Sequence, residues 1–250
     1  MEKNKVLTVV RITTALAVWI IVFKLYGALI DPLLEGHLPV MARMIISSMA
    51  VPYTLALGAF YIIVRGMPVS SDKSSGRINF FKFFIIQTGI SFPCLIMANA
   101  MIKMLGLEMT GITAEELFGH LCFYIFLLLI FNPVMEELLF RKFILERLGC
   151  LGFKGSVICS AVLFAIPHLI SQGPAQVIYT FALGLVWAYV TLKTGKLWPA
   201  VILHSLSNVY GAFLPMTFAQ INPVMSVLFV AFTMLVIVPT AIILIVREFK

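Results

Sequence analysis

The sequence has 250 residues, of which 61% are hydrophobic and only 12% are charged, with a formal net charge of +7. Soluble domains carry about 25% charged residues, so this composition excludes an ordinary soluble protein and favours a polytopic helical membrane protein. The positive charge does not indicate nucleic-acid binding, because the basic residues lie in short segments between apolar stretches, where orientation in the bilayer explains them. The four cysteines lack the spacing of a zinc site or a disulfide framework.

Eight apolar segments predict an all-α fold of eight transmembrane helices enclosing an intramembrane cavity, in a single integral membrane domain over residues 1–250. The first segment is expected to be a retained anchor, because no convincing cleavage site follows it. Pro133 is expected to kink the fourth. The approximate segments are 6–30, 44–64, 83–102, 117 to the acidic pair at 136 and 137, 155–170, 174–192, 197–216 and 223–246.

The distribution of charge predicts the orientation of these helices. If the N-terminus is cytoplasmic, all 18 basic residues except Lys24, Arg43 and Lys103 fall on the cytoplasmic side. Eight crossings then satisfy the positive-inside rule and leave both termini in the cytoplasm of a multi-pass membrane protein. The short tails and loops favour a bacterial cell membrane.

Polar residues inside the apolar segments mark a candidate site. Glu136 and Glu137 are the two acidic residues embedded in apolar sequence on both sides, and His168 and His204 lie within two later segments. Asn208 follows His204 by four residues and shares its helix face. Intramembrane ionisable groups usually face a bundle interior and often face one another, so these side chains are expected to converge.

Such a set has the chemistry for amide hydrolysis without a covalent intermediate. A carboxylate and an imidazole can deprotonate a shared water, and a second imidazole with a carboxamide can stabilise the resulting oxyanion. Simpler roles are open for each residue: Glu137 with Arg141 suits a helical ion pair, and His or Asn can join helices by hydrogen bonds. Ser205 and Ser207, next to His204, remain possible nucleophiles.

Three motifs in order resemble those of the CPBP intramembrane proteases, which include CAAX prenyl proteases and bacteriocin-processing or self-immunity (Abi) proteins. They are Glu136-Glu137-x-x-x-Arg141, Phe164-x-x-x-His168 and His204-x-x-x-Asn208. The resemblance implies an eight-helix bundle with a cavity open to the cytoplasm and a catalytic core at about 117–216. It implies that Glu136 activates water with help from His168, that His204 and Asn208 form the oxyanion hole, and that Glu137, Arg141 and Phe164 support them.

Cofactor and substrate are less constrained. One carboxylate and two imidazoles could hold zinc, but no HExxH pair is present, and the resemblance favours a metal-independent glutamate peptidase with no cofactor. The expected partner is a peptide or membrane-associated protein substrate cleaved at the cytoplasmic side, such as a bacteriocin or pheromone precursor. A non-proteolytic scaffold, an immunity protein and a proton-coupled transporter are the alternatives; the absence of repeat halves disfavours the last.

A depth mismatch accompanies this site. If Arg141 and Lys154 both mark the membrane interface, Glu136 is shallow, whereas His168, 14 residues past Lys154, is about 21 Å deep. Either residues 141–147 lie deeper within the bundle, or the segment carrying His168 tilts or begins late, after the glycine-rich link at 148–155. We expect the latter two effects together.

Overall fold

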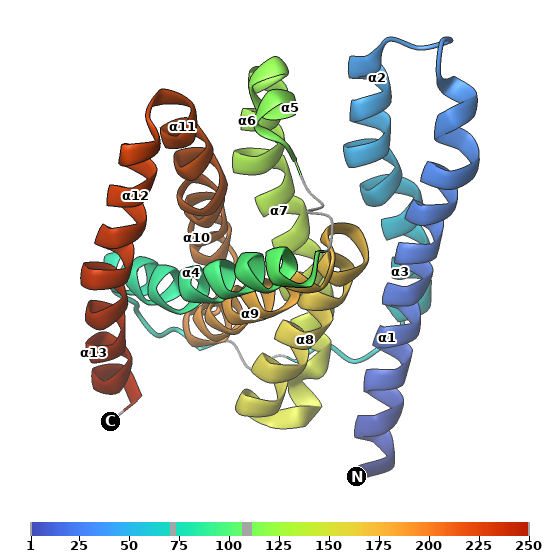
Figure 1. The fold of residues 1–250 in the computed structure, drawn as a ribbon. Helices are drawn as coiled ribbons and strands as arrows, with labels where there is room; N and C mark the ends of the chain where they lie inside the picture. The colour runs from blue at the N-terminus through green and yellow to red at the C-terminus, as the bar shows by residue number, and fades with distance from the viewer. Residues whose placement is uncertain (1, 71–73, 107–111, 250) are drawn as a thin grey trace.

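The computed structural model describes residues 2–70, 74–106 and 112–249, and within these ranges every regular element is a helix. Figure 1 shows the helices as one bundle, with the two ends of the chain at the same end of it. Six stretches of the described residues are long and apolar enough to cross a membrane. They are Lys3–Leu34, Val40–Val64, Phe80–Leu105, Leu121–Gln172, Gln176–Thr194 and Pro223–Phe249.

The first two of these stretches form a hairpin. Helix α1 (Glu2–Leu25) continues through π-helical Tyr26–Ile30 and a short 3₁₀ turn (Asp31–Leu34), and the chain returns through α2 (Val40–Ile45), π-helical Ile46–Ala56 and α3 (Leu57–Val64). An Asp31–Arg43 ion pair of 2.7 Å closes its tip. Lower down, the Trp19 indole donates to the backbone carbonyl of Pro52 over 2.8 Å.

Helix α4 (Phe80–Leu105) lies between α9 (Pro174–Thr194) and the last helix, α13 (Val238–Phe249). The carboxylate of Glu248 on α13 forms ion pairs with Lys82 on α4 and Lys193 on α9. These contacts fix the C-terminal end of the chain against the two helices that it covers (Figure 1).

The long apolar stretch Leu121–Gln172 is itself a helical hairpin. Its first leg contains α6 (Leu121–Phe126), π-helical Leu127–Phe131, α7 (Asn132–Glu137), π-helical Leu138–Ile144 and 3₁₀-helical Leu145–Leu151. Gly152 then adopts a φ of +72°, which glycine tolerates without a side-chain penalty, and the second leg, α8 (Gly152–Gln172), runs back.

The remaining helices complete the bundle. Short α5 (Ala114–Gly119) begins with a capping box between Thr113 and Glu116. After α9 the chain forms α10 (Trp198–Asn208), π-helical Val209–Phe213 and α11 (Leu214–Ile221), followed by α12 (Pro223–Phe232) and π-helical Thr233–Ile237.

Seven of the eight expected crossings therefore correspond to the six candidate stretches in the described part of the chain. Expected segments 117–137 and 155–170 are the two legs of the Leu121–Gln172 hairpin. Expected segment 197–216 matches α10 and α11 but falls outside the six, because its polar residues, including His204 and Asn208, lower its mean hydropathy.

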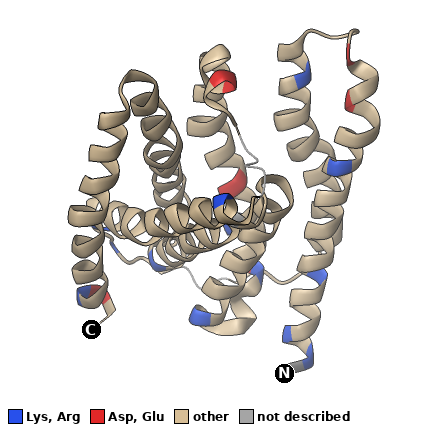
Figure 2. Ribbon diagram, viewed as in Figure 1, with Lys and Arg blue, Asp and Glu red and all other residues tan. Residues whose placement is uncertain are grey.

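Large aromatic side chains fill the centre of the bundle. Phe60, Phe140, Phe164 and Trp187 are each at most 2% exposed and belong to one continuous core. Many apolar side chains instead cover the outer surface, as expected of a multi-pass membrane protein. Figure 2 shows most Lys and Arg residues towards the end of the bundle that holds both chain termini.

Candidate active site

The hairpin Leu121–Gln172 brings Glu136 to His168. Because its legs are antiparallel, residues 32 positions apart in sequence meet, with 4.0 Å between Oε2 of Glu136 and Nε2 of His168. Nearer the turn, Nη1 of Arg141 donates to the hydroxyl of Ser160 over 2.8 Å. These two cross-leg contacts agree in register, so the position of His168 follows from the fold of the hairpin.

Helix α10 adds His204 to the same place. Its Nε2 lies 3.9 Å from Oε2 of Glu136, the same oxygen that faces His168. Its Nδ1 lies 3.1 Å from Oε1 of Glu137. Glu136, His168 and His204, predicted from the sequence to converge, therefore meet from α7, α8 and α10.

Hydrogen bonds indicate the proton positions on both imidazoles. The Nδ1 of His168 lies 2.9 Å from the carbonyl of Phe164, an acceptor, so we assign its proton to Nδ1 and a lone pair to Nε2. The Nδ1 of His204 faces the carboxylate of Glu137 and is assigned a proton in the same way. Both Nε2 atoms thus face Glu136.

Glu136 has an unsatisfied polar atom at the point where the three helices meet. Its Oε2 is buried and has no hydrogen-bond partner among the described residues. The side chain itself is 17% exposed. Buried polar atoms in native proteins are nearly always paired, often to water. A water about 2.8 Å from Oε2 and from either imidazole nitrogen fits separations of 3.9 and 4.0 Å.

Glu137 and Arg141 form a buried ion pair beside this centre. The Nε of Arg141 donates to Oε2 of Glu137 over 2.8 Å, and both side chains are 0% exposed. The guanidinium also lies 5.1 Å from the ring centre of Phe164. Because Glu137 also contacts His204, this ion pair connects the Glu136-Glu137-x-x-x-Arg141 motif to the His204-x-x-x-Asn208 motif.

Two residues of this site have no place in the three motifs. The ring of Trp187 stacks on His204, with 4.2 Å between centroids and 17° between planes. Gln87 accepts from the Trp187 indole and donates to the carbonyl of Leu203, each over 2.8 Å. The available signal was Gln87 itself, a carboxamide in the mostly apolar segment 83–102, which contains a second one in Asn99.

Asn208 lies one turn beyond His204, and its amide donates to the carbonyl of Leu128 over 2.7 Å. One amide proton thus joins α10 to the first leg of the hairpin, and the other is left for a different acceptor. The Ser205 hydroxyl donates to the carbonyl of Leu129 over 2.7 Å, and Ser207 contacts the Tyr179 hydroxyl at 3.2 Å. Both serine hydroxyls therefore have partners other than His204.

The described residues contain no group of three or more His, Cys, Asp or Glu side chains arranged to hold a metal ion. Glu136, His168 and His204 have the donor types for zinc, but the atoms facing one another are 3.9 and 4.0 Å apart.

Comparison with known families identifies the stretch that carries this geometry. Residues 118–210 match the family model described as "Type II CAAX prenyl endopeptidase Rce1-like". The matched stretch contains all three motifs, and it confirms the resemblance to CAAX-type proteases that they indicate. No curated protein and no solved structure gives a significant match to the chain. The family match and the apolar helices support an intramembrane endopeptidase of the CAAX-protease type.

Proposed function

We propose that this protein hydrolyses a peptide bond within the membrane by means of a water activated by Glu136 and His168. The observation that carries the proposal is the buried, unpaired Oε2 of Glu136, which faces the Nε2 atoms of His168 and His204 at 4.0 and 3.9 Å. Three helices place polar residues at one point in an apolar bundle. Such residues cost free energy inside a membrane, which favours a functional role for them.

In the proposed reaction, Glu136 takes a proton from the water, and the oxygen attacks the carbonyl carbon of the scissile bond. The lone pair on Nε2 of His168 orients the water. His204 in its imidazolium form donates from Nε2 to the new oxyanion, with Asn208 as a second donor. The tetrahedral intermediate then breaks its carbon–nitrogen bond, and the proton held by Glu136 passes to the leaving amine.

Glu137 supports this role of His204. Its carboxylate accepts from Nδ1, which fixes the orientation of the ring. Arg141 in turn keeps Glu137 ionised and in place. The mechanism uses no metal ion, so a chelator is expected to leave the activity unchanged.

The topology we propose has eight crossings, with α8 and α10–α11 as separate membrane helices and both termini in the cytoplasm. The return of the chain at Gly152 and the common end of both termini support it (Figure 1). The concentration of basic residues at that end supports its placement in the cytoplasm (Figure 2). Cleavage at that side of a bacterial cell membrane follows from this orientation.

The test uses the full chain in lipid nanodiscs, incubated with prenylated CAAX peptides and with unprenylated bacteriocin-precursor peptides, with mass spectrometry of the products. Glu136→Gln and His168→Asn should each lower the cleavage rate by about 10²–10⁴-fold. Glu115→Gln, at an exposed carboxylate on α5, is the control and should cleave normally. The peptide set that is cleaved identifies the substrate class.

Three results would count against this function. Equal cleavage by wild type and Glu136→Gln would exclude the glutamate mechanism, and loss of activity with a chelator, restored by zinc, would replace it with a metalloprotease. If no peptide is cleaved and Glu136→Gln retains a bacteriocin-immunity phenotype in cells, the fold serves as a non-proteolytic scaffold or immunity protein.

A further inference from the structure

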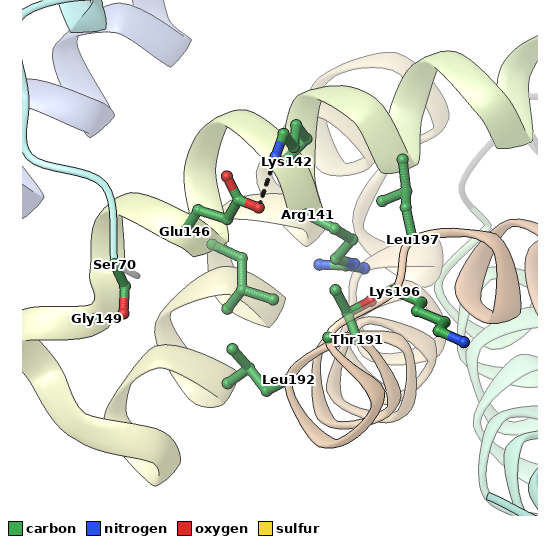
Figure 3. A pocket seen from close by; sticks show the side chains of 11 residues that line it. Ser70, Arg141, Lys142, Glu146, Gly149, Thr191, Leu192, Lys196 and Leu197 are labelled. Atoms are coloured by element: carbon green, nitrogen blue, oxygen red, sulfur yellow. Dashed lines mark hydrogen bonds and ion pairs between the residues drawn. The ribbon is translucent and has the colours of Figure 1, made fainter. Parts of the chain in front are cut away.

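A cavity borders Arg141, and neither Glu137 nor Glu136 is among the residues that line it. It has a volume of about 130 Å³. Its walls come from the end of the first hairpin leg, including Lys142 and Glu146, and from the α9–α10 turn, including Thr191 and Lys196. Figure 3 shows the Arg141 guanidinium and the Thr191 side chain next to each other on its wall.

Two buried donors in this wall are unpaired. Arg141 uses Nε for Glu137 and Nη1 for Ser160, but Nη2 has no partner among the described residues. The hydroxyl of Thr191 is likewise buried and unpaired. By contrast, Thr180 and Thr194 on the same helix donate to the carbonyls one turn earlier. Because a buried unpaired donor costs free energy, these two donors indicate a missing acceptor.

The charges around the cavity favour an anion as that acceptor. Lys142 and Glu146 neutralise each other in an ion pair of 2.9 Å. Lys196 is exposed at the rim. Arg141 is paired with Glu137, so Lys196 provides the net positive charge of the cavity wall, and the Nη2 of Arg141 is a charged donor.

The donor geometry favours a tetrahedral oxyanion over a carboxylate. Arg141 has five N–H donors, of which the one on Nε and one on Nη1 are already used by Glu137 and Ser160. The remaining donors, on Arg141, Thr191 and Lys196, belong to three separate side chains. Phosphate oxygens, which point in several directions, can accept from all three.

We propose that this cavity binds a phosphate group, held by Nη2 of Arg141, the hydroxyl of Thr191 and the ammonium of Lys196. The phosphate belongs either to a free anion or to a lipid headgroup, since the basic end of the bundle faces both. The proposal does not depend on proteolysis, because its donors are the ones that Glu136, His168 and His204 do not use.

The test measures thermal unfolding of the purified full-length protein against increasing inorganic phosphate, with chloride at matched ionic strength as the reference. Phosphate should raise the melting temperature in a saturable way. Thr191→Val and Lys196→Gln should each weaken the apparent affinity by roughly tenfold, the effect of losing one hydrogen bond to a charged group. Lys154→Gln, at an exposed lysine outside the cavity, should match wild type.

A second arm replaces inorganic phosphate with short-chain phosphatidic acid below its micelle concentration, against the matching diacylglycerol. Saturable stabilisation by the lipid but not by the free anion assigns the site to a headgroup, and the reverse assigns it to free phosphate. Identical curves for phosphate and chloride, together with no effect of the lipid, overturn the proposal. Equal loss of affinity in Lys154→Gln and Lys196→Gln also overturns it, because the binding would then be unspecific. Circular dichroism of each variant checks that it is folded.

Discussion

Arg141 donates from Nε to Glu137 over 2.8 Å, with both side chains fully buried, and the other oxygen of Glu137 lies 3.1 Å from His204. The second carboxylate of the motif is therefore occupied on both oxygens, whereas Glu136 keeps a free buried oxygen. Adjacent residues of the same type thus have different environments. This difference supports the proposed roles, in which Glu136 contacts water and substrate and Glu137 orients the His204 imidazole.

Glu137→Gln should impair both stability and activity. The change leaves the buried Arg141 charge without its counter-ion, which typically costs about 3–5 kcal/mol. It also replaces the charged acceptor that orients His204 with a neutral amide oxygen, so kcat should fall more than KM rises. Reversible unfolding in detergent mixtures measures the first effect, and peptide cleavage measures the second.

Glu146→Gln provides the matched control, because Glu146 forms an i,i+4 pair with Lys142 in which the lysine is 46% exposed. Exposed pairs contribute about 0–1 kcal/mol, so this variant should unfold and cleave almost as wild type does. Equal losses of stability and activity in Glu137→Gln and Glu146→Gln would show that any change of charge in this hairpin leg has the same effect. The contact between Glu137 and His204 would then have no specific role.

The three motifs predicted the centre of the site because hydrolytic chemistry needs few residue types, and because those types are rare inside apolar helices. The convergence of Glu136, His168 and His204 could be inferred on this ground. Gln87, Trp187 and Ser160 could not, since their roles depend on which helices pack together. A single Gln or Ser in an apolar segment is compatible with many partners.

The structure resolves the depth mismatch between Glu136 and His168 by the alternative that we did not favour, in which residues 141–147 lie deeper within the bundle. We expected the second leg to begin late, after residue 155, but α8 begins at Gly152. Arg141 and Arg147 are 0% and 7% exposed, so they lie inside the protein and do not mark the membrane interface. Charge alone could not reveal this, because the Ser160 hydroxyl and the carbonyls of Val64 and Phe143 that pair with these arginines become neighbours only in the folded bundle.

Gln87→Leu should lower activity although Gln87 does not touch His204. The change removes both hydrogen bonds of the carboxamide and leaves the Trp187 indole N–H without an acceptor in the core, at a cost of about 1–3 kcal/mol. A shift of the Trp187 ring would displace His204, and displacements near 1 Å reduce rates by up to about 100-fold. Cleavage kinetics of Gln87→Leu and of Thr88→Val, whose hydroxyl contacts only its own helix, separate this effect from a general loss of helix α4.

Gly89→Ala should loosen the C-terminal helix. A Cβ at Gly89 would lie 2.2 Å from the Cβ of Ala241 on α13, so the two helices must separate, which typically costs about 1–3 kcal/mol. Gly58→Ala is the control: a Cβ there has nothing within 4 Å, and it should stabilise its helix by about 0.5–1 kcal/mol. Unfolding of Gly89→Ala with and without Ala241→Gly checks the cause, because the second change should restore most of the loss.

Comparison with Ser205 distinguishes the proposed catalytic role of Asn208 from its role as a contact between helices. Both side chains join α10 to the first hairpin leg, Asn208 through the carbonyl of Leu128 and Ser205 through that of Leu129, each over 2.7 Å. Asn208→Leu and Ser205→Ala should therefore cost similar stability, about 1 kcal/mol each. Only Asn208→Leu removes an oxyanion donor, so its kcat should fall by about 10²–10³-fold with little change in KM. Unfolding and cleavage are measured in parallel on both variants. If their kcat values fall together, in proportion to the loss of stability, Asn208 acts only as a contact between helices. His204 would then be the only one of these two residues that donates to the oxyanion.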